Sequence, residues 1–110
     1  MFKLVIVVRK KESVSREEFR RIWKDIYGPM YRQFPQVKSY VQYHLNDRRK
    51  DTAEDPIDGL AIMTFDKEED MHEAWDTEAY RVAAKIRESI MRETAVGVHV
   101  TNVEEEVVII

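Results

Sequence analysis

Short apolar runs and alternating segments predict four β-strands. The run from Phe2 to Val8 is rich in β-branched residues and too short for a buried helix, so it predicts a strand with two apolar faces. From Val37 to Leu45 the apolar positions recur with a period of two, and segments from Asp58 to Phe65 and from Val96 to Val103 predict the other two strands. Because the first strand is apolar on both faces, we expect it in the centre of its sheet.

A period of three and four residues predicts a helix that begins at Ser15. Ser15 and Glu18 have the spacing of a capping box, and Val14 and Phe19 can form a hydrophobic staple across the first turn. The expected buried stripe of this helix consists of Phe19, Ile22, Trp23, Ile26, Met30 and Phe34. The charged residues between them fall on the opposite, solvated side.

The segment Tyr27-Gly28-Pro29 is expected to break or kink this helix. Pro29 cannot donate to the carbonyl four residues back, and it disfavours helical geometry at Gly28. Tyr27 would then lie at a freed helix end. Its hydroxyl either meets unpaired backbone groups there or meets a ligand.

A second helical region in two parts is predicted after the third strand. Asp66 and Glu69 repeat the capping spacing, and Asp76-Thr77-Glu78 is typical of another helix start. The first part has an apolar face of Met71, Ala74 and Trp75, and the second has a stripe of Tyr80, Ala83, Ala84, Arg87, Ile90 and Met91. The mostly charged segment from Asp47 to Pro56 predicts a mobile loop, which could also act as a lid.

The order strand, helix, strand, strand, helix, strand is that of an α+β fold, the ferredoxin-like βαββαβ sandwich. It predicts a four-stranded antiparallel sheet with helices on one face, and 110 residues suit a single domain over 1–110. The other sheet face is also apolar and needs a cover. The simplest cover is the sheet of a second copy, with the tail from Val107 to Ile110 paired along an edge of the partner. We therefore expect a homodimer.

Composition and charge exclude several kinds of partner. With 18 basic and 21 acidic residues, the formal net charge of −3 provides no basic field for a nucleic-acid backbone. The apolar run from Phe2 to Val8 is too short to span a bilayer, and its basic residues follow it, unlike those of a signal peptide. The absence of cysteine fits a reducing compartment. We expect a cytoplasmic protein with no nucleic-acid or membrane partner.

Few chemistries remain once the sequence motifs are considered. The chain has no glycine-rich phosphate loop, no Ser-His-Asp motif and no H-E-x-x-H pair. His44, His72 and His99 lack local metal-ligand spacing, so neither a metal nor a cofactor is expected. Cofactor-free proton transfer in a small apolar pocket remains, with an imidazole and a tyrosine hydroxyl as base and acid.

Several candidate residues for that pocket lie on strands. Tyr40, Gln42 and His44 alternate along one strand face, which could be a solvated edge, a dimer contact or a pocket wall. His99 on the last strand is a second pocket candidate, although a sheet edge or a subunit contact would explain it equally well. His72 lies in a charged turn and is expected to be solvated.

Several segments have counterparts in a known protein family. They are the run from Phe2, Ser15-Arg16-Glu17-Glu18-Phe19, Tyr27-Gly28-Pro29, Tyr40-Val41-Gln42-Tyr43-His44 and Asp58-Gly59-Leu60-Ala61. Over nearly its whole length the chain resembles the ethyl tert-butyl ether degradation (EthD) family of dimeric α/β-barrel proteins. The resemblance implies a homodimer whose two sheets close into a barrel, with a pocket between each sheet and its own helices. It also implies cofactor-free chemistry, such as lactone isomerisation, cyclisation, dehydration or decarboxylation of polyketide-like aromatics.

The chain departs from the family pattern at Tyr27 and at Tyr43. The family commonly has His-Gly-Pro or His-Ala-Pro at Tyr27-Gly28-Pro29, and Gln-Asn-His at Gln42-Tyr43-His44, so His44 is kept and the helix histidine is replaced by Tyr27. The resemblance implies a lyase or isomerase for a small aromatic, lactone or polyketide-like compound, with His44 as base and Tyr27 as acid or carbonyl anchor. The residues expected to line or orient the substrate are Trp23, Tyr40, Gln42 and His99. The alternative is a non-catalytic dimeric binding or accessory protein of a catabolic or biosynthetic pathway.

Overall fold

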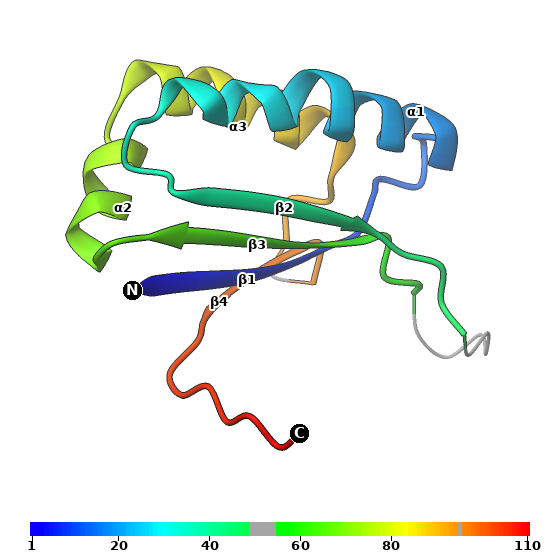
Figure 1. Cartoon of the computed structure of the whole chain (residues 1–110). Helices are drawn as coiled ribbons and strands as arrows, with labels where there is room; N and C mark the ends of the chain where they lie inside the picture. Colours follow the sequence, from blue (N-terminus) through cyan, green and yellow to red (C-terminus); the bar gives the residue numbers. More distant parts are fainter. Residues whose placement is uncertain (49–54, 95) are drawn as a thin grey trace.

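The chain forms a sheet covered on one face by helices. The computed structural model describes residues 1–48, 55–94 and 96–110. The strands are β1 (Phe2–Val8), β2 (Ser39–His44), β3 (Gly59–Phe65) and β4 (Val98–Asn102), in the antiparallel order β2-β3-β1-β4. The helices α1 (Arg16–Ile22), α2 (Glu68–Trp75) and α3 (Glu78–Ile90) cover one side of the sheet (Figure 1). The predicted ferredoxin-like α+β fold is confirmed.

β1 lies in the centre of the sheet, as its two apolar faces predict. It pairs with β3 from Phe2 opposite Phe65 to Val8 opposite Gly59, and with β4 on its other side. Because successive side chains point to opposite faces, every second residue of each strand meets the helices. Leu4 and Val8 are therefore buried in the core with Ile6 half-buried on the same face, while Val5 and Val7 face the open side.

The first helix begins where its cap predicts. Ser15 is the N-cap of α1, and its hydroxyl oxygen accepts a hydrogen bond from the Glu18 backbone nitrogen at 3.1 Å. The helix then continues as a π-helix, η1 (Trp23–Tyr27), and as a 3-10 helix, η2 (Gly28–Gln33). Gly28 keeps helical angles of φ −54° and ψ −52°. The chain therefore stays helical through Gly28 and Pro29 with a change from π to 3-10 winding. The predicted break is wrong, and the alternative of a kink stays a prediction.

The change of winding moves the buried face of this helix. A π-turn holds more residues than an α-turn, so the face that meets the sheet advances by about one position. The buried side chains are Phe19, Trp23, Tyr27, Tyr31 and Phe34. Ile26, which α-helical spacing places in the core, is 42% exposed, and Met30 is half-buried. The sequence prediction is wrong for Ile26 because it assumed α-helical spacing where the chain forms a π-helix.

The two later helices have different starts. The Thr77 hydroxyl oxygen accepts from the Tyr80 backbone nitrogen at 3.1 Å, so the predicted cap of α3 is confirmed. The predicted cap at Asp66 is wrong, since α2 begins at Glu68 with Lys67 as its N-cap and no capping side chain. The chain bends over residues 66–67 after β3, which leaves the Asp66 carboxylate outside the first helical turn.

The core between the two layers centres on Trp23. This side chain is 1% exposed, and its ring stacks on Phe19 with centroids 5.4 Å apart. A Cβ added at Gly59 would lie 2.5 Å from a ring carbon of Trp23. The indole therefore packs directly on the backbone of β3, where any side chain would displace it.

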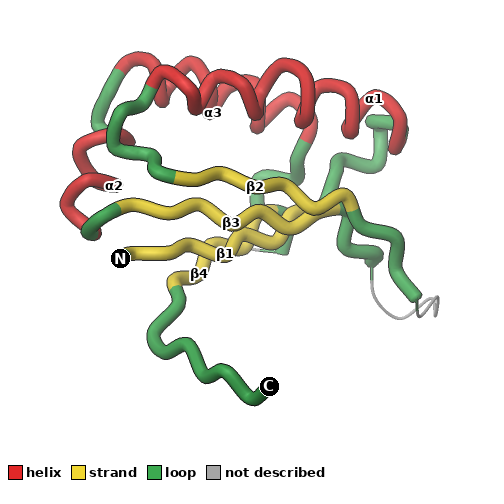
Figure 2. Tube along the Cα trace, viewed as in Figure 1, coloured by secondary structure: helices red, strands yellow, loops and turns green. Residues whose placement is uncertain are grey.

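The open face of the sheet and the C-terminal tail both expose apolar groups. The open face carries Val5, Val7, Val41, Tyr43, Leu60 and Ile62. The tail leaves β4 and runs away from the sheet (Figure 2), and Val107 to Ile110 are exposed.

Residues 49–54 of the loop predicted to be mobile or a lid lie outside the described residues. Across the part of the chain that the structure describes, no helix has the length and apolar character needed to cross a membrane.

Candidate functional site

A small internal cavity of about 40 Å³ lies between the helices and the sheet. It adjoins a wider cavity of about 480 Å³ beside α3 and β4. Both are lined by Trp75, Tyr80, Arg87, Met91, Val98 and Val100. The inner cavity also touches Ile6, Val8, Trp23, Tyr27, Tyr31, Tyr40, Ala61 and Met63. We call the two together the helix-side cavity, with an inner end and an outer mouth.

Two tyrosine hydroxyls meet at the inner end. The hydroxyl oxygens of Tyr27 and Tyr31 lie 2.5 Å apart, and either can be the donor. The two residues are four apart on the η1–η2 helix, so both rings project from its buried face. The Tyr31 ring also meets Tyr40 of β2 edge-on, with centroids 4.9 Å apart. The helix and the edge strand thus each supply phenols to the same wall.

These phenols remain protonated. Burial raises the pKa of Tyr27, of Tyr31 and of Tyr40, because desolvation penalises a phenolate. When two hydroxyls share one hydrogen bond, one hydrogen is used and the other is available to an acceptor. The Tyr27–Tyr31 pair can therefore donate one hydrogen bond to an oxygen atom placed in the cavity.

Arg87 brings a positive charge into this site. It belongs to the buried stripe of α3, and its Nη1 donates to the Tyr80 hydroxyl at 3.0 Å. Burial opposes the charge of Arg87, but the hydrogen bond to Tyr80 and the nearby Tyr27 and Tyr31 phenols outweigh it and raise the pKa. Tyr80 in turn stacks on Trp75 with centroids 5.3 Å apart. A guanidinium and neutral phenols around one small space favour an oxygen that carries negative charge.

Gln42 connects β2 to the π-helix. Its Nε2 donates to the Trp23 carbonyl at 2.8 Å and to the Tyr40 hydroxyl at 3.0 Å, and its Oε1 lies 3.1 Å from His44 Nε2. The Trp23 carbonyl also accepts the π-type bond from the Gly28 backbone nitrogen. A Cβ at Gly28 would lie 2.9 Å from Gln42 Nε2. The glycine therefore gives the amide room to reach the backbone.

His44 is held beside Trp23. The two rings have centroids 4.9 Å apart. Burial, followed by the charges of Arg20 and Lys24, lowers the pKa of His44, which favours the neutral imidazole at neutral pH. His44 lines neither part of the helix-side cavity.

The structure gathers some of the predicted site residues and separates others. Trp23, Tyr27 and Tyr40 line the inner end. His99 pairs with Val7 across the β1–β4 ladder, so strand alternation puts it on the open face of the sheet. The prediction that His99 lines the same pocket as Trp23 and Tyr40 is therefore wrong for this chain's own helix-side cavity. Within residues 1–48, 55–94 and 96–110, no three His, Asp or Glu side chains form a group that could hold a metal ion.

Sequence reasoning missed four aromatic or charged residues of the inner end: Tyr31, Trp75, Tyr80 and Arg87. Arg87 carried a usable signal, because a charged residue within an apolar helical stripe needs a buried partner. No comparable signal marks Tyr31 in the sequence, because α-helical spacing places it outside the buried stripe. The π-turn at Trp23–Tyr27 turns this side chain towards the sheet.

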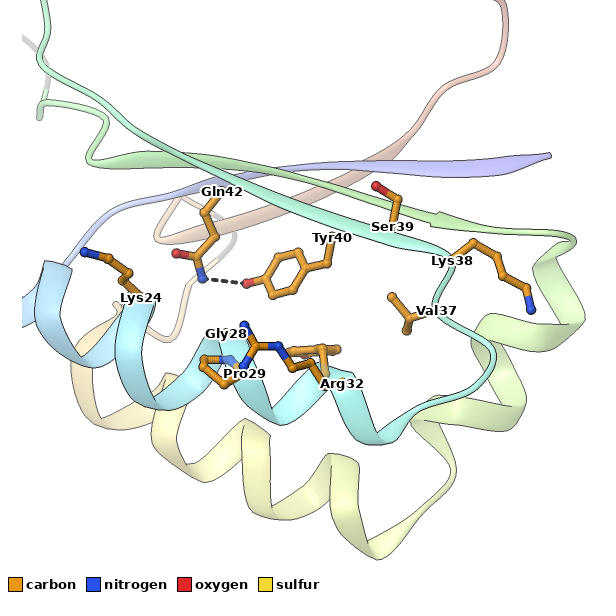
Figure 3. A pocket seen from close by; sticks show the side chains of 10 residues that line it. Lys24, Gly28, Pro29, Arg32, Val37, Lys38, Ser39, Tyr40 and Gln42 are labelled. Atoms are coloured by element: carbon orange, nitrogen blue, oxygen red, sulfur yellow. Dashed lines mark hydrogen bonds between the residues drawn. The ribbon is translucent and has the colours of Figure 1, made fainter.

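A second cavity of about 370 Å³ lies at the sheet edge between η2 and β2 (Figure 3). It is lined by Lys24, Gly28, Pro29, Tyr31, Arg32, Val37, Lys38, Ser39, Tyr40 and Gln42. We call it the edge cavity. Its wall of Tyr31 and Tyr40 is shared with the inner end of the helix-side cavity.

Comparisons with known proteins agree with this architecture. A family model described as the EthD domain matches residues 11–88. An EthD family protein from Bacillus halodurans has a TM-score of 0.72 at 16% identity, covering 96% of this chain and 99% of that chain. A protein from Arabidopsis thaliana has a TM-score of 0.75 at 18% identity, covering 100% of both chains. A dimeric protein of unknown function with a ferredoxin-like fold, from Bacteroides fragilis, has a TM-score of 0.69 at 10% identity, covering 94% and 95%. No curated protein matched the chain.

Proposed function

The chain belongs to the EthD family, and from this premise we propose that it binds a small aromatic, lactone or polyketide-like compound and acts on it as a cofactor-free lyase or isomerase. The observation that carries the proposal is the Tyr27–Tyr31 hydroxyl pair beside Arg87 at the closed end of the helix-side cavity. Such a site matches a carbonyl oxygen that becomes an enolate oxygen during proton transfer.

The size of the cavity indicates how a ligand would lie. The inner end, at about 40 Å³, has room for a functional group and not for a whole ligand. The outer mouth, at about 480 Å³, has room for a ring system between Met91 and the stacked pair of Trp75 and Tyr80. The ligand would therefore enter with its carbonyl oxygen first and leave its apolar body in the mouth.

The proposed step conserves atoms and electrons without a redox partner. A base removes a proton from the carbon next to the carbonyl, and the electron pair of that bond moves to the oxygen, which the Tyr27–Tyr31 pair and Arg87 stabilise. The proton then returns at another position, or a leaving group departs from the neighbouring carbon. We assign the base to His44, whose lowered pKa keeps the imidazole neutral at neutral pH.

The second candidate function is binding without catalysis, in an accessory role. One observation favours it: His44 contacts Trp23 but lines neither part of the helix-side cavity. Among the described residues, the acidic side chains of this cavity, Glu88 and Glu93, line the outer mouth, and the inner end has no Asp, Glu or His that could take the proton instead. A ligand held there would have its oxygen bound and its carbon untouched.

An enolisable aryl ketone separates the two candidates. With phenylacetone in D₂O, we expect the protein to accelerate exchange of the ketone α-hydrogens, followed by proton NMR. Tyr27→Phe should slow this exchange and weaken ketone binding, each about tenfold, because the Tyr31 hydroxyl loses the partner that orients it and polarises its O–H bond. Tyr43→Phe is the control, since Tyr43 is exposed on the opposite sheet face. Binding of the ketone with exchange at the solvent rate would establish the accessory function instead.

We also propose that the protein is a homodimer closed by its C-terminal tail. The B. fragilis neighbour is described as dimeric, and this chain exposes an apolar sheet face together with Val107 to Ile110. Burying these four side chains against a partner would contribute roughly 1.5–3 kcal/mol each before ordering costs.

Removing residues 107–110 should therefore weaken the dimer and lower its melting temperature. Light scattering after size exclusion and a thermal scan would measure both effects. A control of unchanged length, with these four residues replaced by serine, should behave like the truncated chain, since the apolar side chains are what the partner buries. A truncated chain that stays dimeric and melts at the original temperature would refute this role of the tail.

A further inference from the structure

We infer that the edge cavity is a second binding site, and that it takes a small aromatic carboxylate. This cavity lies outside the helix-side cavity, between η2 and the edge strand β2 (Figure 3). Its volume of about 370 Å³ lies in the range of small-ligand pockets, which is about 300–1,000 Å³. The inference does not depend on the proposed reaction, because it uses a different cavity and different charged residues.

The charges of the edge cavity point to an anion. Its lining includes Lys24, Arg32 and Lys38 and no acidic residue, although the whole chain has a formal net charge of −3. Lys38 lies 3.9 Å from Asp66, and because both side chains are about half exposed this pair is weak. Among the described residues, Lys24 and Arg32 form no ion pair. Two cations at one cavity without a carboxylate partner favour an anionic ligand.

The remaining walls of the cavity suit a flat apolar body. Pro29 and Val37 line it together with the rings of Tyr31 and Tyr40. Figure 3 shows the Arg32 side chain extending back along η2 beside Pro29, on the side where Tyr40 and Gln42 face the cavity. A carboxylate can accept two hydrogen bonds from a guanidinium, while an attached ring packs against tyrosine. An aromatic carboxylate thus satisfies both the charge and the shape.

The two cavities can be distinguished by the residues that they do not share. Lys24 and Arg32 line the edge cavity alone, whereas Trp75 and Arg87 line the helix-side cavity alone. Binding at the edge should therefore perturb Lys38 and residues 39–42 of β2. Binding at the helix side should perturb α3 and β4.

Benzoate is the probe that tests the inference, titrated into the full chain and followed by proton–nitrogen NMR. We expect saturable shifts at the amides of Gly28 and of residues 38–42. Arg32→Gln should weaken benzoate binding about tenfold, because it removes a charged hydrogen-bond donor. Arg81→Gln is the control and should bind as the unchanged protein does, since Arg81 is an exposed arginine paired with Glu78 and lines none of these cavities. Benzamide, the uncharged analogue, should also bind about tenfold more weakly.

Several results would overturn the inference. Shifts confined to Trp75 and Arg87, equal binding of benzamide, or equal binding by the Arg32→Gln variant would each do so. If that variant does not fold, Lys24→Gln replaces it with the same expected loss. A last result concerns a chain that ends at Val103 and so lacks the acidic tail. If this chain binds benzoate and the full chain does not, the tail of a second copy occupies the cavity and the small-molecule assignment is wrong.

Discussion

Replacing Trp23 with alanine should lower the free energy of unfolding by about 3–5 kcal/mol, which is the usual cost of removing a large aromatic side chain from a core. The indole is 1% exposed and packs on Phe19, on His44 and on the backbone at Gly59. Urea denaturation followed by circular dichroism measures the change. Trp75→Ala is the matched control and should cost less, because Trp75 is only half-buried. A midpoint unchanged by Trp23→Ala would contradict the position of the indole in the core.

The contact with Gly59 gives this prediction an internal check. Gly59→Ala should be destabilising by about 1–3 kcal/mol, because the added methyl group meets the Trp23 ring carbons at 2.5 and 2.6 Å. In a Trp23→Phe background the same change should cost much less, since phenylalanine lacks the benzo ring that occupies this space. Equal costs in both backgrounds would show that the clash is with another group.

His44→Gln should slow exchange of the phenylacetone α-hydrogens by about 10²- to 10⁴-fold if His44 is the base. Glutamine keeps hydrogen bonding towards Gln42 but cannot accept a proton at neutral pH, so ketone binding should survive the change. His72→Gln, on an exposed site of α2, is the control and should have no effect. If the His44→Gln variant exchanges the α-hydrogens at the original rate, His44 is not the base. That result would favour the accessory function.

The pH dependence provides a second test of His44. Burial, with Arg20 and Lys24 nearby, lowers the pKa of His44. In the proposed step the neutral imidazole is the active form. The exchange rate should therefore rise with pH through a midpoint below the ordinary imidazole pKa and become constant above it. In the His44→Gln variant this rise should disappear. A rate that falls as the pH increases through this range would mean that the protonated form acts.

The sequence predicted the architecture because local signals and the global fold agree. Ser15 and Thr77 each cap the helix that they precede in the sequence, and the alternation in β2 correctly separates the face of Gln42 and His44 from the face of Val41. These features depend on neighbours a few residues away. Periodicity and capping rules describe such interactions well.

The details of the candidate site were less predictable because they depend on contacts that are distant in sequence. The π-turn at Trp23–Tyr27 is supported by the Gln42 amide from β2, and it turns Tyr31 inwards. The place of Arg87 depends on Tyr80 on the same helix and on phenols from the first helix. The pairing of β4 with β1 decides which face His99 occupies. Apart from the pair of Tyr80 and Arg87 on α3, none of these relations has a fixed sequence spacing.

The wall shared by the two cavities has a thermodynamic consequence. The Tyr31 and Tyr40 rings, 4.9 Å apart, form one side of the edge cavity and one side of the inner cavity. We expect a ligand that fixes these rings from one side to change the free energy of binding on the other side. By linkage, the factor by which benzoate alters the affinity for the ketone must equal the factor by which the ketone alters the affinity for benzoate. Two titrations in opposite order would therefore return the same coupling free energy.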